Sequence, residues 1–317
     1  MGHPFAVIRV LVLGAHAGAL QFFLRRFPAS GDYLVARRFR EAHDGAKGSN
    51  QAICATRLGA STTLLSAVGD DERGRAALGY MRREGMNIEH VLIGREQPTG
   101  FGAGFYLEDG SVMGATYVGA TTEITCGYLE NQAGAFTGGQ RLFLASLELP
   151  ADVALYGLQL ARRAGIPLTV LNPSPADDLP RLPLPDVYVL TPKEPEARLL
   201  AGLAPDGDEP YPDVAEALAA VFRVPLIVMT LGEQGCYVHG RGISRHYSCP
   251  KVRAVDTSGA GDCFNASLAL GLAGGWDLER AVQFALHAAT LSVTRPDSWP
   301  AYPTVNEVEE FIETGRT

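Results

Sequence analysis

Apolar runs and helical patterns alternate along the second half of the chain, and this alternation restricts the possible folds more than any other feature. Beginning near Arg141, short runs typical of strands are separated by segments with the spacing of amphipathic helices. The predicted strands are 142–145, 168–171, 187–190 and 226–230, and the predicted helices are 151–164, 193–200, 213–222, 278–293 and 305–312. Strands that alternate with helices form mainly parallel sheets. Each helix carries the chain back to the end of the sheet where the previous strand began, so the next strand runs in the same direction. We therefore predict an α/β fold with a doubly wound, mainly parallel sheet and helices on both of its faces.

The sequence also predicts a small second sheet. Residues 20–43 have an extended pattern that mixes aromatic residues with arginines, and residues 99–119 have the pattern of a hairpin with its turn at Glu108-Asp109-Gly110-Ser111. We predict that these two segments form a β lid over a ligand cleft, where a lid would exclude water. The aromatic residues of this lid are also suited to a homodimer interface.

We predict that all 317 residues form one domain, 1–317, of which the lid is a part. The hydrophobic content of 46% and the charged content of 20% are those of an ordinary globular protein. A net charge of −8 without long basic runs argues against a nucleic-acid partner, and the uncharged run after Arg9 is too short to cross a membrane. The five cysteines form no C-x-x-C pair, which favours a reduced, cytoplasmic protein without structural zinc.

A glycine-rich turn, Asp256-Thr257-Ser258-Gly259-Ala260-Gly261-Asp262, joins a predicted strand to a predicted helix. Its glycines let an anion approach the N–H groups of the first helical turn, where the helix dipole adds positive charge. Asp262 is then placed to take a proton from a hydroxyl that attacks the anion, which predicts phosphoryl transfer to an alcohol. The alternative is an ordinary helix start, with Thr257 or Ser258 as N-cap and Asp262 as a first-turn acid.

A second glycine-rich loop, Asp44-Gly45-Ala46-Lys47-Gly48-Ser49-Asn50, precedes a helix predicted at 51–58. Here Lys47 and Asn50 would direct polar groups into the cleft, and Asn50 could bond to sugar hydroxyls. The alternative is a plain loop with Ser49 as N-cap. An earlier Gly14-x-x-x-Gly18 spacing differs from the G-x-G-x-x-G of dinucleotide-binding folds, which disfavours a dehydrogenase.

Both loops together resemble the two signatures of the ribokinase-like, or PfkB, carbohydrate kinases. Further segments are similar to ribokinases in the right order, so that the resemblance covers almost the whole chain. These segments are Leu147-Glu148, Leu171 to Ala176, Thr191-Pro192-Lys193-Glu194 and Thr230 to Gly235. Two signatures about two hundred residues apart are far more specific than either one alone.

The resemblance implies roles for individual residues. Asp262 would be the base, and the N–H groups of Gly259, Ala260 and Gly261 would stabilise the transferring γ-phosphoryl group. The residues implied to bind the sugar are Lys47, Gly48, Asn50 and Glu148. Those implied to bind ATP are Lys193, Thr230, Gly232, Gly235 and His287.

The resemblance also implies metal ions. Glu196 matches the Mg²⁺-associated position, where it would act through water. Asp256 and Ser258, with the segment around Arg295, match the region that holds a monovalent cation such as K⁺. For two of the implied site residues a structural alternative stays open: Glu196 as a solvated helix acid, and His287 as a packed histidine.

The chain departs from the ribokinase pattern at three places. Ala17 and Ala19 stand where an Asn-x-Asp pair grips the sugar, so ribose itself is in doubt as the acceptor. Lys193 replaces the asparagine that begins the Asn-x-x-Glu motif; it could pair with phosphate or weaken Mg²⁺ binding. Asp297 stands where ribokinases have glycine, next to the implied cation site.

The sequence therefore predicts an ATP- and Mg²⁺-dependent sugar kinase whose partner is a small carbohydrate. Two alternatives remain: a nucleoside kinase of the same fold, and a non-catalytic relative that binds a nucleotide or a sugar.

Overall fold

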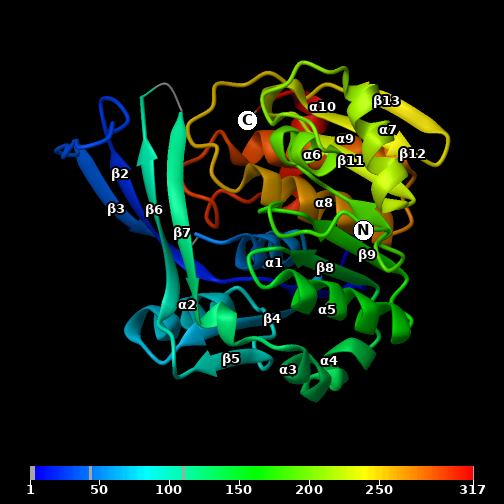
Figure 1. Cartoon of the computed structure of the whole chain (residues 1–317), viewed down its shortest axis with the longest axis horizontal. Helices are drawn as coiled ribbons and strands as arrows, with labels where there is room; N and C mark the ends of the chain where they lie inside the picture. Colours follow the sequence, from blue (N-terminus) through cyan, green and yellow to red (C-terminus); the bar gives the residue numbers. More distant parts are fainter. Residues whose placement is uncertain (1–3, 43–44, 109–110, 317) are drawn as a thin grey trace.

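The computed structural model describes residues 4–42, 45–108 and 111–316. Within these residues a nine-stranded sheet runs through the centre of the molecule in the order β13-β12-β11-β10-β9-β8-β1-β4-β5 (Figure 1). Its strands are β1 (Arg9–Leu13), β4 (Ser61–Gly69), β5 (Val91–Gly94), β8 (Leu142–Ser146), β9 (Leu168–Asn172), β10 (Val189–Leu190), β11 (Leu226–Thr230), β12 (Cys236–Gly240) and β13 (Ile243–Tyr247). The strands from β11 to β5 are parallel, and β12 and β13 add an antiparallel edge. The predicted mainly parallel sheet is confirmed.

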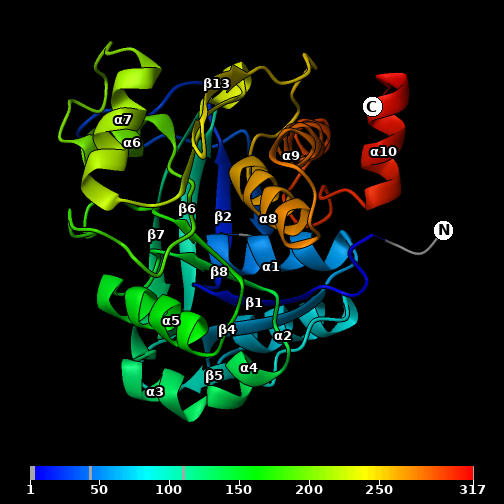
Figure 2. The same cartoon turned by 90° about the vertical axis from the view of Figure 1, so that its right-hand side faces the viewer.

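Helices cover both faces of the sheet (Figure 2). One face carries α1 (Lys47–Arg57), α2 (Glu72–Arg83), α8 (Ala260–Ala273), α9 (Leu278–Ser292) and α10 (Val305–Thr314). The other carries α3 (Cys126–Asn131), α4 (Ala133–Thr137), α5 (Ala151–Arg163), α6 (Glu194–Ala201) and α7 (Tyr211–Phe222). None of the helices within the described ranges is long and apolar enough to span a bilayer.

The central strand β1 explains why both faces must be covered. Val10 and Val12 belong to the core under α1 and α8, whereas Leu11 and Leu13 belong to the core under α5. Because successive side chains of a strand point to opposite faces, a continuous apolar run needs a helical layer on each side.

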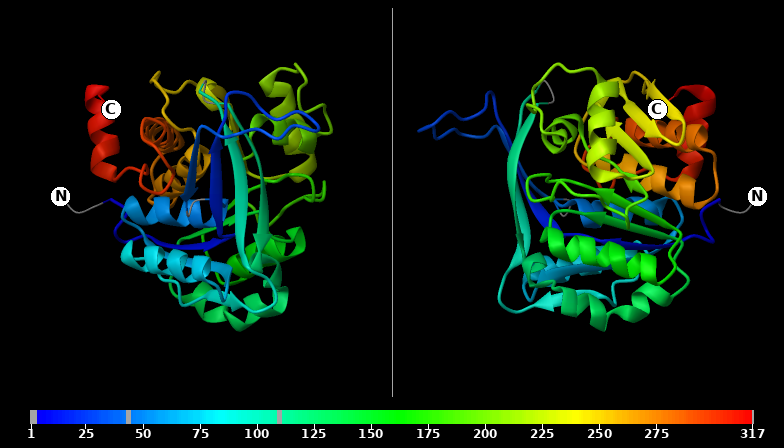
Figure 3. Two further views of the ribbon diagram at one scale, coloured as in Figure 1. Left: turned by 90° about the vertical axis from the view of Figure 1, so that its left-hand side faces the viewer. Right: turned by 45° about the vertical axis from the view of Figure 1, so that its right-hand side comes forward.

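A second sheet of four strands, β3-β2-β6-β7, stands at one end of the molecule and is called the lid sheet below (Figures 1 and 3). Its strands are β2 (Ala17–Phe23), β3 (Arg38–Ala42), β6 (Thr99–Tyr106) and β7 (Val112–Gly119). Strand β2 begins at Ala17, three residues before the range expected for the lid. His43 and the turn residues Asp109 and Gly110 lie outside the described residues. The segment between β2 and β3 projects away from the body in Figure 3.

Asp71 joins the lid sheet to the body. As N-cap of α2, it accepts a hydrogen bond from the Gly74 N–H at 2.7 Å. Its carboxylate also accepts from the N–H of Thr99 at 2.7 Å and from the Thr99 hydroxyl at 2.6 Å. Burial raises the pKa of Asp71, but the hydrogen bonds from Thr99 and Gly74 outweigh it, and the net effect is a lowered pKa.

Asp71→Ala is expected to lower the free energy of unfolding by about 1–3 kcal/mol, because it leaves a cap and two donors of Thr99 without their acceptor. Denaturant unfolding would measure the loss. Since the pKa of Asp71 is depressed in the folded state, the contribution is present above the unfolded pKa of about 3.9 and disappears as pH falls further.

The neighbouring exposed Asp70, paired only with Arg75 among the ion pairs of the described residues, provides the control. Asp70→Ala should change stability by no more than about 0.5 kcal/mol. Equal losses in the two variants would contradict the role of Asp71.

Candidate active site

The candidate site lies where the N-terminus of α8 meets the N-terminus of α1. Helix α8 begins at Ala260, and its N-cap is Gly259 with φ 72°. A Cβ atom at Gly259 would lie 2.3 Å from the Tyr302 hydroxyl, so no side chain fits there. The alternative of an N-cap at Thr257 or Ser258 is therefore wrong, and the helix starts from a backbone that only glycine adopts easily.

Asp262 lies in the first turn of α8 and is 5% exposed. Two amides of α1 hold its carboxylate: Asn50 Nδ2 donates to Oδ2 at 3.0 Å, and Gln51 Nε2 donates to Oδ1 at 3.1 Å. The indole of Trp299 in turn donates to Oδ1 of Asn50 at 2.7 Å. A buried carboxylate is thus fixed in one orientation at the positive end of a helix.

Helix α1 begins at Lys47 with Ala46 as N-cap, four residues before the expected start. Ser49 consequently lies inside the helix and is not its N-cap. The early start puts Asn50 and Gln51 on the same helical turn, which lets both amides reach Asp262. Gln51 and Trp299 were not among the predicted site residues; the signal for Gln51 was its place directly after Asn50 in the signature.

Asn50 was predicted to bind sugar hydroxyls, and the structure adds a second role. Its side-chain amide donates to Asp262 and accepts from Trp299, and the residue is only 4% exposed. Both ends of the amide therefore have partners within the protein, and Asn50 positions the Asp262 carboxylate.

Four charged residues surround this carboxylate: Lys47, Glu148, Lys193 and Glu196. Glu148 follows β8 and accepts a hydrogen bond from the backbone N–H of Lys47 at 2.6 Å. Burial raises the pKa of Glu148 to about 7, although the charge of Lys47 acts in the opposite direction.

The pKa values of Lys47 and Lys193 are shifted in opposite directions. Burial by itself lowers the pKa of Lys47, but the charges of Asp262, Glu148 and Glu196 outweigh it and raise the pKa. The adjacent positive charge of Lys47 is the main reason that the pKa of Lys193 is lowered. Lys193 also lies close to the α8 N-terminus, since a Cβ on Gly261 would be 4.0 Å from its Cε. Two cations and three carboxylates thus occupy one site.

Three of the residues predicted to bind the nucleotide lie at or just after the end of β11. Thr230 ends β11 and pairs with Lys193 in an isolated parallel bridge. Gly235 has φ 99°, and a Cβ there would lie 2.0 Å from the carbonyl oxygen of Tyr247, so the fold itself requires this glycine. Gly232 also has a positive φ, 59°, but has open space around it.

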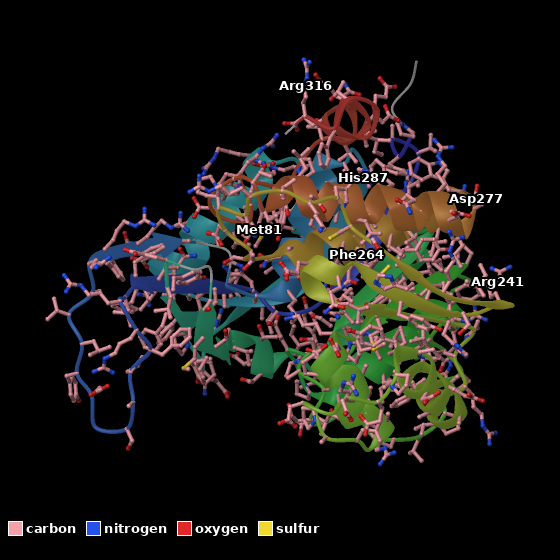
Figure 4. The ribbon with its side chains drawn as sticks, turned by 90° about the horizontal axis from the view of Figure 1, so that it is seen from above. Met81, Arg241, Phe264, Asp277, His287 and Arg316 are labelled. Carbon is pink, nitrogen blue, oxygen red and sulfur yellow. The ribbon has the colours of Figure 1, made fainter. Side chains whose placement is uncertain are left out.

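His287 lies on α9 on the side toward α10 (Figure 4). Its ring packs edge-on against Phe311 with centroids 5.5 Å apart, and Nδ1 lies 2.7 Å from the carbonyl oxygen of Gln283. The structure therefore places His287 in a helix–helix contact, as the packed alternative expected.

The residues expected at metal sites have protein partners. Glu196 accepts a hydrogen bond from the Lys193 backbone N–H at 2.8 Å, and Arg295 pairs with Glu307 at 2.7 Å. Asp256 accepts from the N–H of Ser258 at 2.9 Å. Within the described residues no group of three or more His, Cys, Asp or Glu side chains could hold a metal ion by itself.

Comparison with known proteins identifies the family of this chain. The family model "pfkB family carbohydrate kinase" matches residues 12–304, which include every residue of the candidate site. The chain belongs to the pfkB family. As a member of it, the protein is a phosphotransferase, a sugar or nucleoside kinase with the ribokinase fold.

Individual pfkB relatives resemble the chain over nearly its full length. The ribokinase of Bacillus subtilis is 32% identical over 305 residues, covering 96% of this chain and 99% of the relative. The ribokinase structure from Giardia lamblia superposes with a TM-score of 0.86 at 24% identity, covering 98% and 99% of the two chains. The Arabidopsis thaliana ribokinase structure, a complex with ribose and ATP, gives 0.80 at 22% identity with coverage of 98% and 99%.

Replacement of Glu148 tests the charge balance of this pfkB site. The pKa of Glu148 is about 7 when folded and near 4.5 otherwise, so the stability linked to it is full below pH 4.5 and is lost as pH rises through 7. Glu148→Gln puts a side chain that does not ionise at this position, so the variant does not lose this stability as pH rises. The free energy of unfolding of the variant should therefore rise relative to wild type by on the order of 2 kcal/mol between about pH 5 and 8.

Denaturant unfolding across this pH range would measure the difference. Glu216→Gln, at an exposed acid on α7, should show no such trend. A pH-independent difference between wild type and Glu148→Gln would show that Glu148 titrates normally.

Proposed function

We propose that the protein is an ATP- and Mg²⁺-dependent kinase that transfers the γ-phosphoryl group to a hydroxyl of a small carbohydrate. One observation carries the proposal: a buried carboxylate, Asp262, is oriented by two amides at the N-terminus of α8, beside two lysines. A base next to an anion-binding helix end is what phosphoryl transfer to an alcohol requires.

In the proposed reaction the acceptor hydroxyl gives its proton to Asp262 while its oxygen forms a bond to the γ-phosphorus. The bond between that phosphorus and the β–γ bridging oxygen breaks, and ADP leaves. Asn50 and Gln51 keep the carboxylate turned toward the acceptor, which lowers the reorganisation that the step needs.

The negative charge of the transferring group would be stabilised by backbone N–H groups and by the lysines. Gly259, Ala260 and Gly261 supply N–H groups at the α8 N-terminus, and Lys47 and Lys193 supply positive charge. Lys193 would thus contact phosphate directly. For the nucleotide we propose Thr230, at the end of β11, and Gly232 and Gly235 just after it.

The site fits a Mg²⁺ ion that is bound mainly by the nucleotide. Mg²⁺ keeps several waters and commonly takes one or two carboxylates plus substrate phosphates. Glu196 would supply a carboxylate, and the described residues offer no group of three or more His, Cys, Asp or Glu side chains that could hold the ion without the nucleotide. Bound there, the ion would neutralise phosphate charge.

The lid sheet would exclude water from the site. The hydroxyl of Tyr106 at the end of β6 lies 3.1 Å from that of Ser258, in the loop before α8. The side chains of Phe39, Met113 and Tyr117 remain exposed on the lid sheet, and we propose that they form a homodimer interface. The five free cysteines support a reducing, cytoplasmic setting.

The acceptor is the open part of this proposal. Ala17 and Ala19 lie on β2, where Ala19 pairs with Ala42 on one side and Gly102 on the other, so this part of the lid sheet is built from small residues. A nucleoside is the alternative acceptor, because Ala17 and Ala19 lack the side chains of the Asn-x-Asp pair. A non-catalytic binding protein is the other alternative. ADP release measured with pentoses, hexoses, sugar acids and nucleosides distinguishes all three.

Asp262→Asn should reduce kcat by at least about a hundredfold, because the amide cannot accept the proton. ADP release would measure turnover, and circular dichroism would check the fold. The matched control is Asp213→Asn, since Asp213 is also an acid in the first turn of a helix, α7, but is exposed and away from the site. Near-normal turnover of Asp262→Asn would overturn the proposal.

Ala19→Asp tests whether the missing carboxylate limits the use of ribose. A charge-assisted hydrogen bond is worth about 1.5–3 kcal/mol, so kcat/KM for ribose should rise about tenfold to a hundredfold. Ala19→Asn is the uncharged control and should give a smaller gain. No gain with either variant would mean that the acceptor is gripped elsewhere.

A further inference from the structure

Arg40, on the lid strand β3, reaches across to two carboxylates of the body. Its guanidinium forms ion pairs with Asp297 and, at 3.4 Å, with Asp256. The Asp256 side chain is only 8% exposed, and those of Arg40 and Asp297 are 26% and 27% exposed. These partly buried charges are screened by water much less than a surface pair, which strengthens their attraction.

The Arg40 guanidinium is held in place from the lid side as well. Its Nε donates to Oε1 of Gln21 at 2.8 Å, and Gln21, directly opposite on β2, is 1% exposed. Arg40 therefore has a fixed orientation before any ligand binds, and the planar fork of its donors suits two carboxylates at once.

This is the region in which the sequence predicted a monovalent cation, and both carboxylate oxygens of Asp256 already have donors. One oxygen of Asp256 accepts from the Ser258 N–H at 2.9 Å, and the other accepts from the Asp297 N–H at 3.2 Å and from Arg40. Asp297 has φ 70°, so it keeps the left-handed backbone of the expected glycine while adding a carboxylate that pairs with Arg40. A K⁺ ion would have to displace a guanidinium from both carboxylates, and the residues do not fit it.

We infer that the guanidinium of Arg40 is a built-in cation that replaces a monovalent metal ion and joins the lid sheet to the loop before α8. Asp256 lies three residues before Gly259, and its carboxylate shapes the turn through the Ser258 N–H. The charge of Arg40 therefore orders the backbone that leads to the anion-binding N–H groups. Arg40 is a positioning residue that acts through Asp256.

This inference rests on the proposed kinase activity for its kinetic consequences, but its binding consequence can be measured independently. A monovalent cation activates an enzyme when it completes an otherwise unfinished charge arrangement. Here Arg40 already supplies the positive charge, because β3 of the lid sheet holds its guanidinium against Asp256 and Asp297. Wild type should neither bind K⁺ tightly nor depend on it.

The experiment compares wild type with Arg40→Ala in KCl and in tetramethylammonium chloride, at a constant ionic strength of about 0.1 M. Thermal unfolding is the first readout. K⁺ should leave the Tm of wild type unchanged and should raise the Tm of Arg40→Ala, because the variant exposes two carboxylates that a cation stabilises by mass action.

ADP release is the second readout. The kcat of wild type should agree within about twofold in the two salts, whereas Arg40→Ala should lose at least about tenfold in tetramethylammonium and regain part of it in KCl or guanidinium chloride. Rescue by a free cation would separate a positioning charge from a merely structural side chain.

Arg73→Ala is the matched control. Arg73, on α2, also joins the body to β3, through an exposed pair with Glu41 at 3.1 Å. It should show neither the kinetic loss nor the gain of K⁺ response. A rise in the Tm or a more than about twofold rise in the kcat of wild type with K⁺ would overturn the inference, as would an Arg40→Ala variant indifferent to K⁺ in both readouts. An absence of ADP release with every acceptor would instead contradict the kinase proposal, and the thermal readout would still decide the role of Arg40.

Discussion

The hydrogen bonds between α1 and the Asp262 carboxylate join parts of the chain that are more than two hundred residues apart. They exist because two glycine-rich loops, one after β3 of the lid sheet and one after β13 of the nine-stranded sheet, begin two helices that pack against each other. Gly259 has no room for a side chain, and Asn50 is held by Trp299. The carboxylate is buried without losing its partners, since amide donors replace the water that it gives up. The architecture of the site follows from this pairing.

Charged side chains of both signs lie around Asp262, and their charges shift one another's pKa values. Glu148 has a raised pKa because it is buried, and Lys47 has a raised pKa because three carboxylates surround it. Lys193 is the exception, since its pKa is lowered chiefly by Lys47. A polyanion such as ATP would relieve this repulsion between the lysines. The replacement of an asparagine by Lys193 therefore suits a site that meets phosphate.

Several sets of contacts connect the lid sheet to the body, among them polar contacts made by Asp71, Tyr106 and Arg40. Asp71 binds the first residue of β6, Tyr106 meets Ser258, and Arg40 pairs with Asp256 and Asp297. The last two contacts involve the loop before α8. The position of the lid sheet and the geometry of the loop before α8 are therefore coupled through these polar contacts.

The sequence by itself determined the fold class and predicted Asp262 at the start of a helix, because both are encoded locally. The strands and helices after residue 141 match their predictions to within about two residues, and Asp262 is in the first turn of a helix as expected. The short helices α3 and α4 had no clear period and were not predicted. Only the tertiary structure decided where the early start of α1 places Gln51, that Trp299 orients Asn50, that His287 packs against Phe311, and that Arg40 faces two carboxylates. Each of these contacts joins residues far apart in the chain, and periodicity and local motifs carry no information about which distant partner a side chain will meet.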